Sequence, residues 1–447
     1  MKLRPVHALY AFVVGLPLHN LVMAELYEAG LRGAGLDVVS AWKEALLVAA
    51  LAWVALEALR ARKLPFDLVL VDALALAYAA VVVLYALIPQ SALDGDAGAK
   101  AIVFGLRHDL ALVAAYFLGR AVRVDLRKVG WTIAGVAAAV TVWGLVDVYA
   151  VPLQWWRESG VPGWFRDELG HRYQGLSGLP ENWIYNTGDE QHPLRRLVST
   201  FLSPLATSYL LVVALLLLAV RLRARAAVAL ALLCAAGLAW TYSRASWLAL
   251  AVGLCVLALA WRRAWPVAAA ALVIGLGVGF AKAYPHVGPE TSFTAAELVY
   301  QRERAQRSPD ASHDPLSPSE SSISSHWRNL RDGVETVVRH PQGYGLGNAG
   351  ATAQRFGVPL RAGESSYTEL GVEIGLAGVA LFLAWCGVLL WSVRGSPALA
   401  AALAAVLALG VQTDVIGVHW LAYSLWWLAG SFAVAPALAS ASRVRSE

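Results

Sequence analysis

The chain is a succession of apolar runs, each about as long as a segment that crosses a lipid bilayer. A membrane-spanning helix takes about 20 largely apolar residues, and about twelve such runs occur along the chain. Hydrophobic residues make up 58% of the 447 residues and charged residues only 15%, so there is too little polar surface for a soluble protein of this size. The sequence therefore predicts an all-α polytopic membrane protein. The runs lie at 6–24, 38–59, 67–88, 101–122, 129–150, 197–220, 225–242, 246–261, 264–284, 366–393, 397–413 and 416–436.

Lysine and arginine give the orientation, because short basic clusters fall at every second connection. The positive-inside rule places such clusters, and here both termini, in the cytoplasm. The formal net charge of +5 then comes from basic clusters that set the membrane orientation. These clusters form no basic face, so we expect no nucleic-acid partner. The clusters lie at 2–4, 60–63, 120–128, 221–225, 262–263, 394 and 443–445.

Two outward connections are too long to be turns. They divide the chain into nine helices in 1–284 with an outer loop near 151–195, a large outer loop in 285–365 with amphipathic helices, and three helices with a cytoplasmic tail in 366–447. Aromatic side chains at this depth anchor at the headgroup level, and a sugar-stacking platform is the alternative for the first loop. Its tryptophans are Trp155, Trp156, Trp164 and Trp183.

The large loop contains an amphipathic helix that Ser322 can cap and that ends at His340 and Pro341. We expect this helix to lie over the membrane domain, with His326 and Arg331 flanking its apolar stripe. The stripe consists of Ile323, Trp327, Leu330, Val334, Val337 and Val338.

Three arginines lie at the outer ends of helices, against the positive-inside preference: Arg195, Arg196 and Arg244. A cation at the membrane edge is costly unless it is paired. The sequence shows no surplus of carboxylates beside these arginines, which favours an anionic ligand such as a lipid diphosphate. Snorkelling to headgroups, or an ion pair with a loop carboxylate, is the alternative.

We expect neither a cofactor nor a metal. No Asp-x-Asp or His-Glu-x-x-His pattern occurs. The three cysteines, Cys234, Cys255 and Cys386, lie inside apolar runs without CxxC spacing, which is typical of small buried hydrophobic residues.

Four segments resemble motifs of the bacterial O-antigen ligase and O-antigen polymerase superfamily, in the family's order and spacing, over roughly residues 190–430. Arg196-Leu-Val-Ser-Thr-Phe-Leu-Ser-Pro204 is similar to Arg-x-x-Gly-Thr-Phe-x-Asn-Pro. Thr241-Tyr-Ser-Arg-Ala-Ser-Trp-Leu248 is similar to Thr-x-Ser-Arg-Gly-x-Trp-Leu. His340-Pro-Gln-Gly-Tyr-Gly-Leu-Gly347 is similar to His-Pro-x-x-Gly-x-Gly, and Glu364 to Gly378 is similar to His-Asn-x-Tyr-Leu-x-x-Leu-x-Glu-x-Gly-Leu-x-Gly.

The chain departs from these motifs at several positions. Ser199 and Ser203 replace the usual Gly and Asn of the first motif, and Glu364 stands where lipopolysaccharide ligases carry the histidine regarded as catalytic. The function could therefore be that of a standard lipopolysaccharide ligase, of a polymerase, or of a ligase for another acceptor.

The resemblance implies a GT-C-like, metal-independent, inverting glycosyltransferase with about twelve transmembrane helices. Such an enzyme would pass a glycan from a polyprenyl (undecaprenyl) diphosphate to an acceptor sugar or lipid-glycan, at the outer face of the bacterial inner membrane. A lipid-linked glycan flippase or exporter without transferase activity is the alternative, with Arg107-His108-Asp109 as the intramembrane charge cluster best suited to it. Pairing of Arg107 with Asp109 or with a neighbouring helix is the structural interpretation of that cluster.

The expected site follows from this chemistry. A carboxylate whose pKa is raised in a partly dry site can act as base, so Glu364 is the candidate general base and His326 the reserve. The expected ligands of the donor diphosphate are Arg196, Arg244 and Arg331, and the expected glycan contacts are Tyr367, Arg328 and Trp327.

Overall fold

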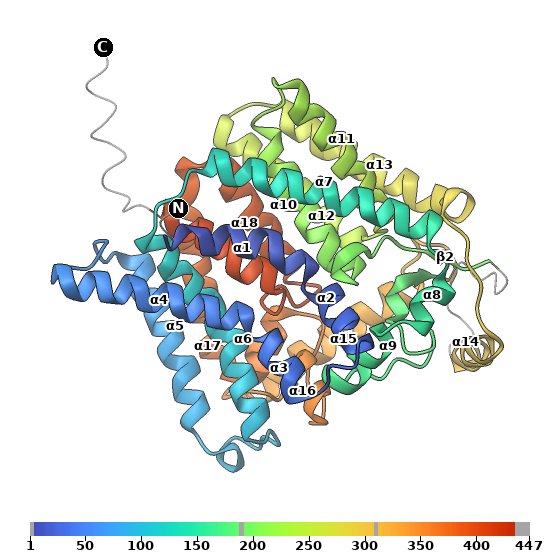
Figure 1. The fold of residues 1–447 in the computed structure, drawn as a ribbon, viewed down its shortest axis with the longest axis horizontal. Helices are drawn as coiled ribbons and strands as arrows, with labels where there is room; N and C mark the ends of the chain where they lie inside the picture. Colours follow the sequence, from blue (N-terminus) through green and yellow to red (C-terminus); the bar gives the residue numbers. More distant parts are fainter. Residues whose placement is uncertain (1–3, 187–191, 308–311, 434–447) are drawn as a thin grey trace.

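The structure is a computed structural model that describes residues 4–186, 192–307 and 312–433. It is mostly helical, and in these residues its β-structure is one short antiparallel pair with a few isolated bridges (Figure 1). The strands of that pair are β1 (Ile184–Tyr185) and β2 (Leu194–Arg195), in which Ile184 faces Arg195.

The chain up to residue 201 forms the first group of helices and turns. Their bounds are α1 (Val6–Gly15), η1 (Leu16–Leu18), α2 (His19–Glu28), α3 (Ala34–Ser40), α4 (Trp42–Ala61), α5 (Leu70–Leu87), η2 (Gln90–Ala92), α6 (Ala99–Ala121), α7 (Leu126–Ala150), α8 (Leu153–Glu158), α9 (Val161–Gly163), η3 (Trp164–Glu168), η4 (Glu181–Trp183) and η5 (Ser199–Phe201).

The second half contributes the most buried helices and those of the large loop. Their bounds are α10 (Pro204–Ala219), α11 (Arg225–Trp240), α12 (Arg244–Trp261), α13 (Trp265–Val287), α14 (Ala295–Arg307), α15 (Ser321–Arg339), α16 (Gly350–Phe356), α17 (Ser366–Ser392), η6 (Val393–Gly395), α18 (Pro397–Leu409), η7 (Leu421–Leu425) and α19 (Trp426–Phe432).

The apolar runs coincide with helices, which confirms a multi-pass membrane protein. By length and composition, 7 helices of the described residues can cross a membrane, or up to 8 when the bent pair α3 and α4 is one span. Helices α10, α11 and α18 are shorter apolar helices, and the last run extends past residue 433, outside the described residues. The count of about twelve spans stays a prediction.

Local sequence accounts for the ends and bends of these helices. The Asp125 carboxylate caps α7 by accepting from the backbone N–H groups of Arg127 and Lys128. Within α17, Gly375 has a φ of 70°, and a side chain at this position would lie 2.7 Å from the Pro341 carbonyl oxygen. A glycine is therefore required where α17 kinks around the chain after Pro341.

The loop of 151–195 folds into a small core of its own. Trp156, Trp164 and Trp183 are buried in it, packed with Met23 and Leu36 of the N-terminal helices. The expected anchoring at headgroups is wrong for these three tryptophans, because each is 4% exposed or less and cannot reach lipid. Trp155, 47% exposed, is the one of the four that is open to lipid or ligand.

The amphipathic helix of the large loop is α15, and it packs on α17 through small residues. Gly333 lies against Thr368, and Val337 lies against Gly371. The expected packing through the apolar stripe is only partly correct, because the large stripe residues Trp327, Val334 and Val338 are exposed. Ser322 is not the cap, since the Glu320 carboxylate accepts from the backbone N–H of Ile323.

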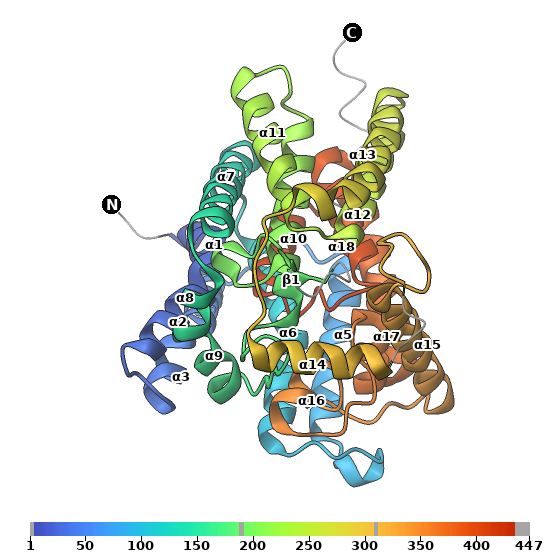
Figure 2. The same ribbon diagram turned by 90° about the vertical axis from the view of Figure 1, so that its right-hand side faces the viewer.

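The helices of the large loop gather at one end of the molecule. Figure 2 shows α14, α15 and α16 at the end opposite to that reached by the start of α11 and of α13. The basic clusters 221–225 and 262–263 precede α11 and α13. The large loop and these basic clusters therefore lie at opposite ends, as the predicted topology requires.

Candidate functional site

The first two motifs meet at one turn between helices. Arg196 donates from Nε to the carbonyl oxygen of Thr241 at 2.9 Å, and the backbone N–H of Leu197 donates to Trp240 at 2.9 Å. This turn leads into α12, whose first residue is Arg244. The folded chain therefore brings Arg196 and Arg244 to the same turn.

The Arg196 guanidinium has no carboxylate partner within the described residues. Its hydrogen bonds go to the backbone carbonyls of Thr241 and Tyr242. Burial, with the nearby charge of Arg244, lowers the pKa of Arg196 to about 10, so the group remains protonated at neutral pH. A partly buried cation without an anion is unfavourable, so Arg196 is suited to bind an anionic group.

The other two arginines of the predicted set are paired. Arg195 lies 3.1 Å from the Asp147 carboxylate, and both side chains are buried. Arg244 lies 2.9 Å from the Glu320 carboxylate. The expected lack of carboxylates is therefore wrong for Arg195 and Arg244, and the ion-pair alternative is realised there.

The two candidate bases are in contact. Nδ1 of His326 on α15 lies 2.6 Å from Oε2 of Glu364, which precedes α17. The distance is that of an ion pair, although the ring N–H is not aligned as in a hydrogen bond. Both side chains are partly open to solvent. We call these two residues the His326–Glu364 pair.

The pair changes the expected chemistry of Glu364. Contact with His326 outweighs desolvation and holds the pKa of the Glu364 carboxyl below its usual value, where the sequence predicts a raised pKa. Glu364 also has a φ of 68°, a strained conformation for a residue with a side chain. Strain of this kind concentrates at functional sites when the surrounding structure holds it in place.

Hydrogen bonds tie the start of α17 to the chain between α18 and η7. Ser366 donates from its backbone N–H to the Gly410 carbonyl at 3.0 Å, and its hydroxyl accepts from the backbone N–H of Val415. Tyr209 of α10 donates to the Thr413 hydroxyl at 3.0 Å and also lies within the electrostatic reach of Arg196. Hydrogen bonds thus connect α10 with the segment that follows Glu364, and the charge of Arg196 acts on the Tyr209 end of this set.

The remaining predicted residues are less closely associated with this site. Trp327, Arg328 and Arg331 are exposed on α15, and no hydrogen bond or ion pair joins Arg331 to the rest of the described chain. Tyr367 is half-buried and its hydroxyl donates to the Leu407 carbonyl at 2.6 Å. A glycan contact at Tyr367 would therefore have to use the ring.

The alternating glycines of the third motif serve the fold. Gly343, Gly345 and Gly347 all have positive φ, and side chains there would collide with Gly375, Gln90 and Ala101 respectively. This close backbone approach is to the protein itself. The glycines allow the motif to pack against α17, where the backbone N–H of Tyr344 donates to the Val372 carbonyl oxygen at 2.6 Å.

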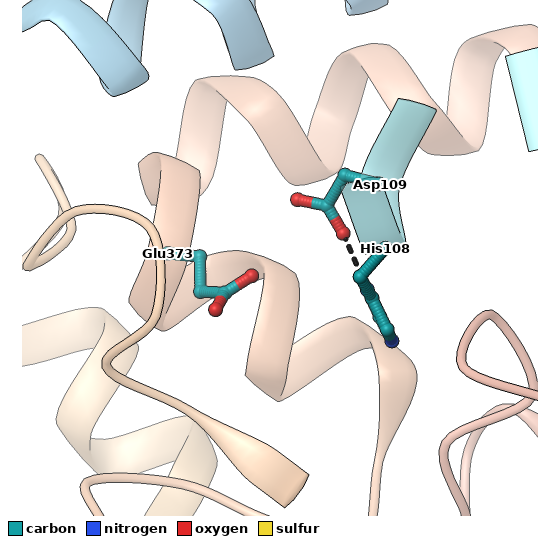
Figure 3. Close-up of side chains that lie close together, drawn as sticks. All are labelled: His108, Asp109 and Glu373. Atoms are coloured by element: carbon teal, nitrogen blue, oxygen red, sulfur yellow. Dashed lines mark hydrogen bonds and ion pairs between the residues drawn. The ribbon is translucent and has the colours of Figure 1, made fainter. Parts of the chain in front are cut away.

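A buried polar cluster beneath the start of α17 has no counterpart among the predicted site residues. It joins His108 and Asp109 of α6 to Glu373 of α17, and one ligand-type atom from each lies within 4.8 Å of the others (Figure 3). Motif spacing could not reveal it, since its members are far apart in sequence. The only sequence feature that pointed to this cluster is the charged run Arg107-His108-Asp109 within an apolar segment. In the structure Arg107 pairs with Glu44 of α4, as expected if Arg107 has a structural role.

Comparison with known families assigns the region that contains three of the four motifs. Residues 229–383 match the family model described as O-antigen ligase. This match supports the resemblance of the chain to the O-antigen ligase and polymerase superfamily. A search of curated proteins found no match.

At Ser199, Ser203 and Glu364, the structure shows a backbone conformation or a side-chain group that can take the place of the family's residue. Ser199 has a φ of 52°, the left-handed conformation that the family's glycine favours. The Ser203 hydroxyl caps α10 by accepting from the N–H of Ala206, a role that the family's asparagine can also fill. At position 364, where ligases carry a histidine, α15 brings the imidazole of His326 against Glu364.

Proposed function

We propose that this protein transfers a glycan from a polyprenyl (undecaprenyl) diphosphate to an acceptor sugar, with inversion and without a metal on the diphosphate. The family assignment of 229–383 supports O-antigen ligase-like transfer. The observation that carries the proposal is the Arg196 guanidinium, a partly buried cation with no carboxylate beside it in the described residues. A diphosphate leaving group is an anion that such a site would stabilise.

In the proposed reaction, the acceptor hydroxyl oxygen attacks the anomeric carbon of the donor glycan. The bond from that carbon to the diphosphate oxygen breaks, and Arg196 stabilises the charge that develops there. Arg244 would join Arg196 on the diphosphate by exchanging Glu320 for the ligand. Arg331 is a third candidate from the exposed face of α15.

The His326–Glu364 pair supplies the base in this proposal. Because its pKa is lowered, Glu364 is a weaker base than the sequence predicts. We therefore assign proton transfer to Nε2 of His326, for which the described residues offer no hydrogen-bond partner, and assign orientation of the ring to Glu364 through Nδ1. Trp327, Arg328 and the ring of Tyr367 are proposed glycan contacts.

We also propose that the site lies at the outer face of the inner membrane, beside the large loop. The donor is then a membrane lipid and the acceptor a sugar on a lipid or on another lipid-linked repeat. Both a ligase and a polymerase fit this arrangement.

The deciding experiment incubates the purified protein with a polyprenyl-diphosphate oligosaccharide and candidate acceptors. A single shifted acceptor band indicates a ligase, and a ladder of products indicates a polymerase. Absence of transfer to any acceptor, together with translocation of the lipid-linked glycan in vesicles, would overturn the proposal in favour of a flippase or exporter.

Metal independence has its own test at 25 °C. Transfer by the purified protein should persist in EDTA, because in the proposal arginine side chains and not a metal ion neutralise the diphosphate. If chelation abolishes transfer and Mg²⁺ restores it without raising thermal stability, a metal holds the diphosphate.

A further inference from the structure

We propose that His108, Asp109 and Glu373 form a binding site for a divalent cation of the Mn²⁺ or Zn²⁺ class. This site goes beyond the proposed transfer reaction, since none of its ligands belongs to the diphosphate site or to the His326–Glu364 pair.

The first argument is an unpartnered oxygen. Asp109 is fully buried, and while Oδ1 lies 2.8 Å from Nδ1 of His108, Oδ2 has no hydrogen-bond partner in the described structure. Figure 3 shows this second oxygen turned to the side on which Glu373 lies. A buried carboxylate oxygen without a partner requires an explanation, and a cation would supply one.

Charge gives the second argument. Asp109 and Glu373 are 0% and 4% exposed, and they face one imidazole inside the helical core. Two carboxylates buried side by side repel each other and lose their hydration. The neighbouring cation Arg107 pairs with Glu44, so it does not neutralise Asp109 or Glu373. A divalent cation would balance both carboxylates.

The groups behind the ligands favour a metal over a chance cluster. Without a cation, Nδ1–H of His108 can donate to Oδ1 of Asp109; a bound cation would replace that proton, and the Asp414 carboxylate, 3.0 Å from Nε2, would then hold the Nε2–H tautomer. Glu373 accepts from the backbone N–H of Gly347 at 2.8 Å. Metal-binding histidines and carboxylates are commonly held by such outer partners, which fix the tautomer and the orientation.

The dimensions also suit a first-row divalent ion. Ligand atoms on opposite sides of such a metal are separated by roughly 4.0–4.4 Å, twice the usual bond length. The three ligand atoms lie within 4.8 Å of one another, so small side-chain shifts would close the site. One imidazole and two carboxylates suit Mn²⁺ or Zn²⁺ better than Ca²⁺, which prefers oxygen ligands throughout.

The test uses the full-length protein purified in detergent without chelator, and its readouts are metal content and thermal stability. We expect about one Mn²⁺ or Zn²⁺ per chain, and after dialysis against EDTA a Tm that rises by several degrees on adding MnCl₂. Bound Mn²⁺ should show nitrogen coupling in spin-echo spectra, because an imidazole is a ligand.

Variants locate the site. Asp109→Asn and Glu373→Gln should each weaken Mn²⁺ binding at least about tenfold. Glu44→Gln, which changes a neighbouring carboxylate outside the cluster, should leave Mn²⁺ binding unchanged. Equal binding by all three variants would place the metal elsewhere and overturn the assignment.

Wild-type protein alone can also reject the site, even if a variant fails to fold. Protein that contains no metal and gains no stability from Mn²⁺ or Zn²⁺ contradicts the proposal. If Asp109→Asn is then more stable than wild type, Asp109 and Glu373 share a proton in place of a cation. Transfer activity is not a readout, so failure of this site and failure of the proposed glycosyl transfer remain distinguishable.

Discussion

At the scale of single residues, Arg196 and Arg244 differ in a way that the sequence does not show. Both are arginines at outer helix ends, but Arg244 is paired with Glu320 and Arg196 is hydrogen bonded only to carbonyls within the described residues. A ligand at Arg196 therefore need not displace a carboxylate. We expect Arg196 to contribute more to donor binding and leaving-group stabilisation than Arg244.

Substitution of Arg196 tests this directly. Arg196→Ala should lower kcat/KM by about 30-fold or more, equivalent to about 2 kcal/mol of transition-state stabilisation, and Arg196→Lys should recover only part because a point charge lacks the bidentate fork. Transfer kinetics on detergent-purified protein measure the effect, with Arg60→Ala, an exposed arginine of a predicted cytoplasmic cluster, as control. Near-normal turnover in Arg196→Ala would remove it from the site.

The His326–Glu364 pair makes a residue-scale prediction about pH. The lowered pKa keeps Glu364 ionised from pH 6 to 9, so Glu364 itself adds no acid limb to the kcat/KM profile in that range. His326→Gln should lower kcat/KM by about 10²-fold, whereas Glu364→Gln should lower it less, because Glu364 only orients the ring in this assignment. The reverse pattern would make Glu364 the base.

The same pair links pH to stability. Because the folded-state pKa of Glu364 is depressed, its contribution to stability is present above the unfolded carboxyl pKa of about 4.3. That contribution is lost as the pH falls through the lower folded-state value. Thermal unfolding between pH 3 and 7 should therefore show a smaller acid loss in Glu364→Gln than in wild type.

At the scale of elements, α15 connects the two halves of the proposed site. Its cap, Glu320, also pairs with Arg244, and two turns later the helix presents His326 to Glu364. The sequence predicts the helix but not its cap, since Ser322 and Glu320 both stand near its start. What selects Glu320 is Arg244, which lies 76 residues away in the chain.

Glu320→Gln tests this double role. Loss of the carboxylate should reduce the free energy of unfolding by about 1 kcal/mol, seen as a lower Tm, because cap and ion pair are both weakened. The KM for the donor should not rise, since the change removes a competitor for Arg244. Asp332→Asn on the exposed face of α15 is the control, and an unchanged Tm in Glu320→Gln would contradict the role.

At the scale of the whole molecule, the apolar runs and basic clusters predict which end of the protein faces outward. The large loop and the clusters before α11 and α13 lie at opposite ends (Figure 2). Trp327→Cys should react with a membrane-impermeant maleimide in intact cells, and Arg60→Cys only after permeabilisation. Cys234 and Cys386 are buried but Cys255 is exposed, against the expectation for all three, so both variants are made with Cys255→Ala and that protein gives the background. Labelling with the opposite pattern would reverse the orientation.

The sequence by itself determined the class of the protein, its helical runs and the resemblance to the superfamily that the match over 229–383 supports, because hydrophobic length, charge spacing and motif order are properties of the chain that need no contacts. Only the tertiary structure decided which arginine is unpaired, that His326 lies against Glu364, and that His108 and Asp109 meet Glu373. Asp414 and His108 are 306 residues apart in the chain, and Arg195 and Asp147 are 48. Such partners are chosen by helix packing, since a buried charge takes whichever counter-charge the neighbouring helix brings within reach.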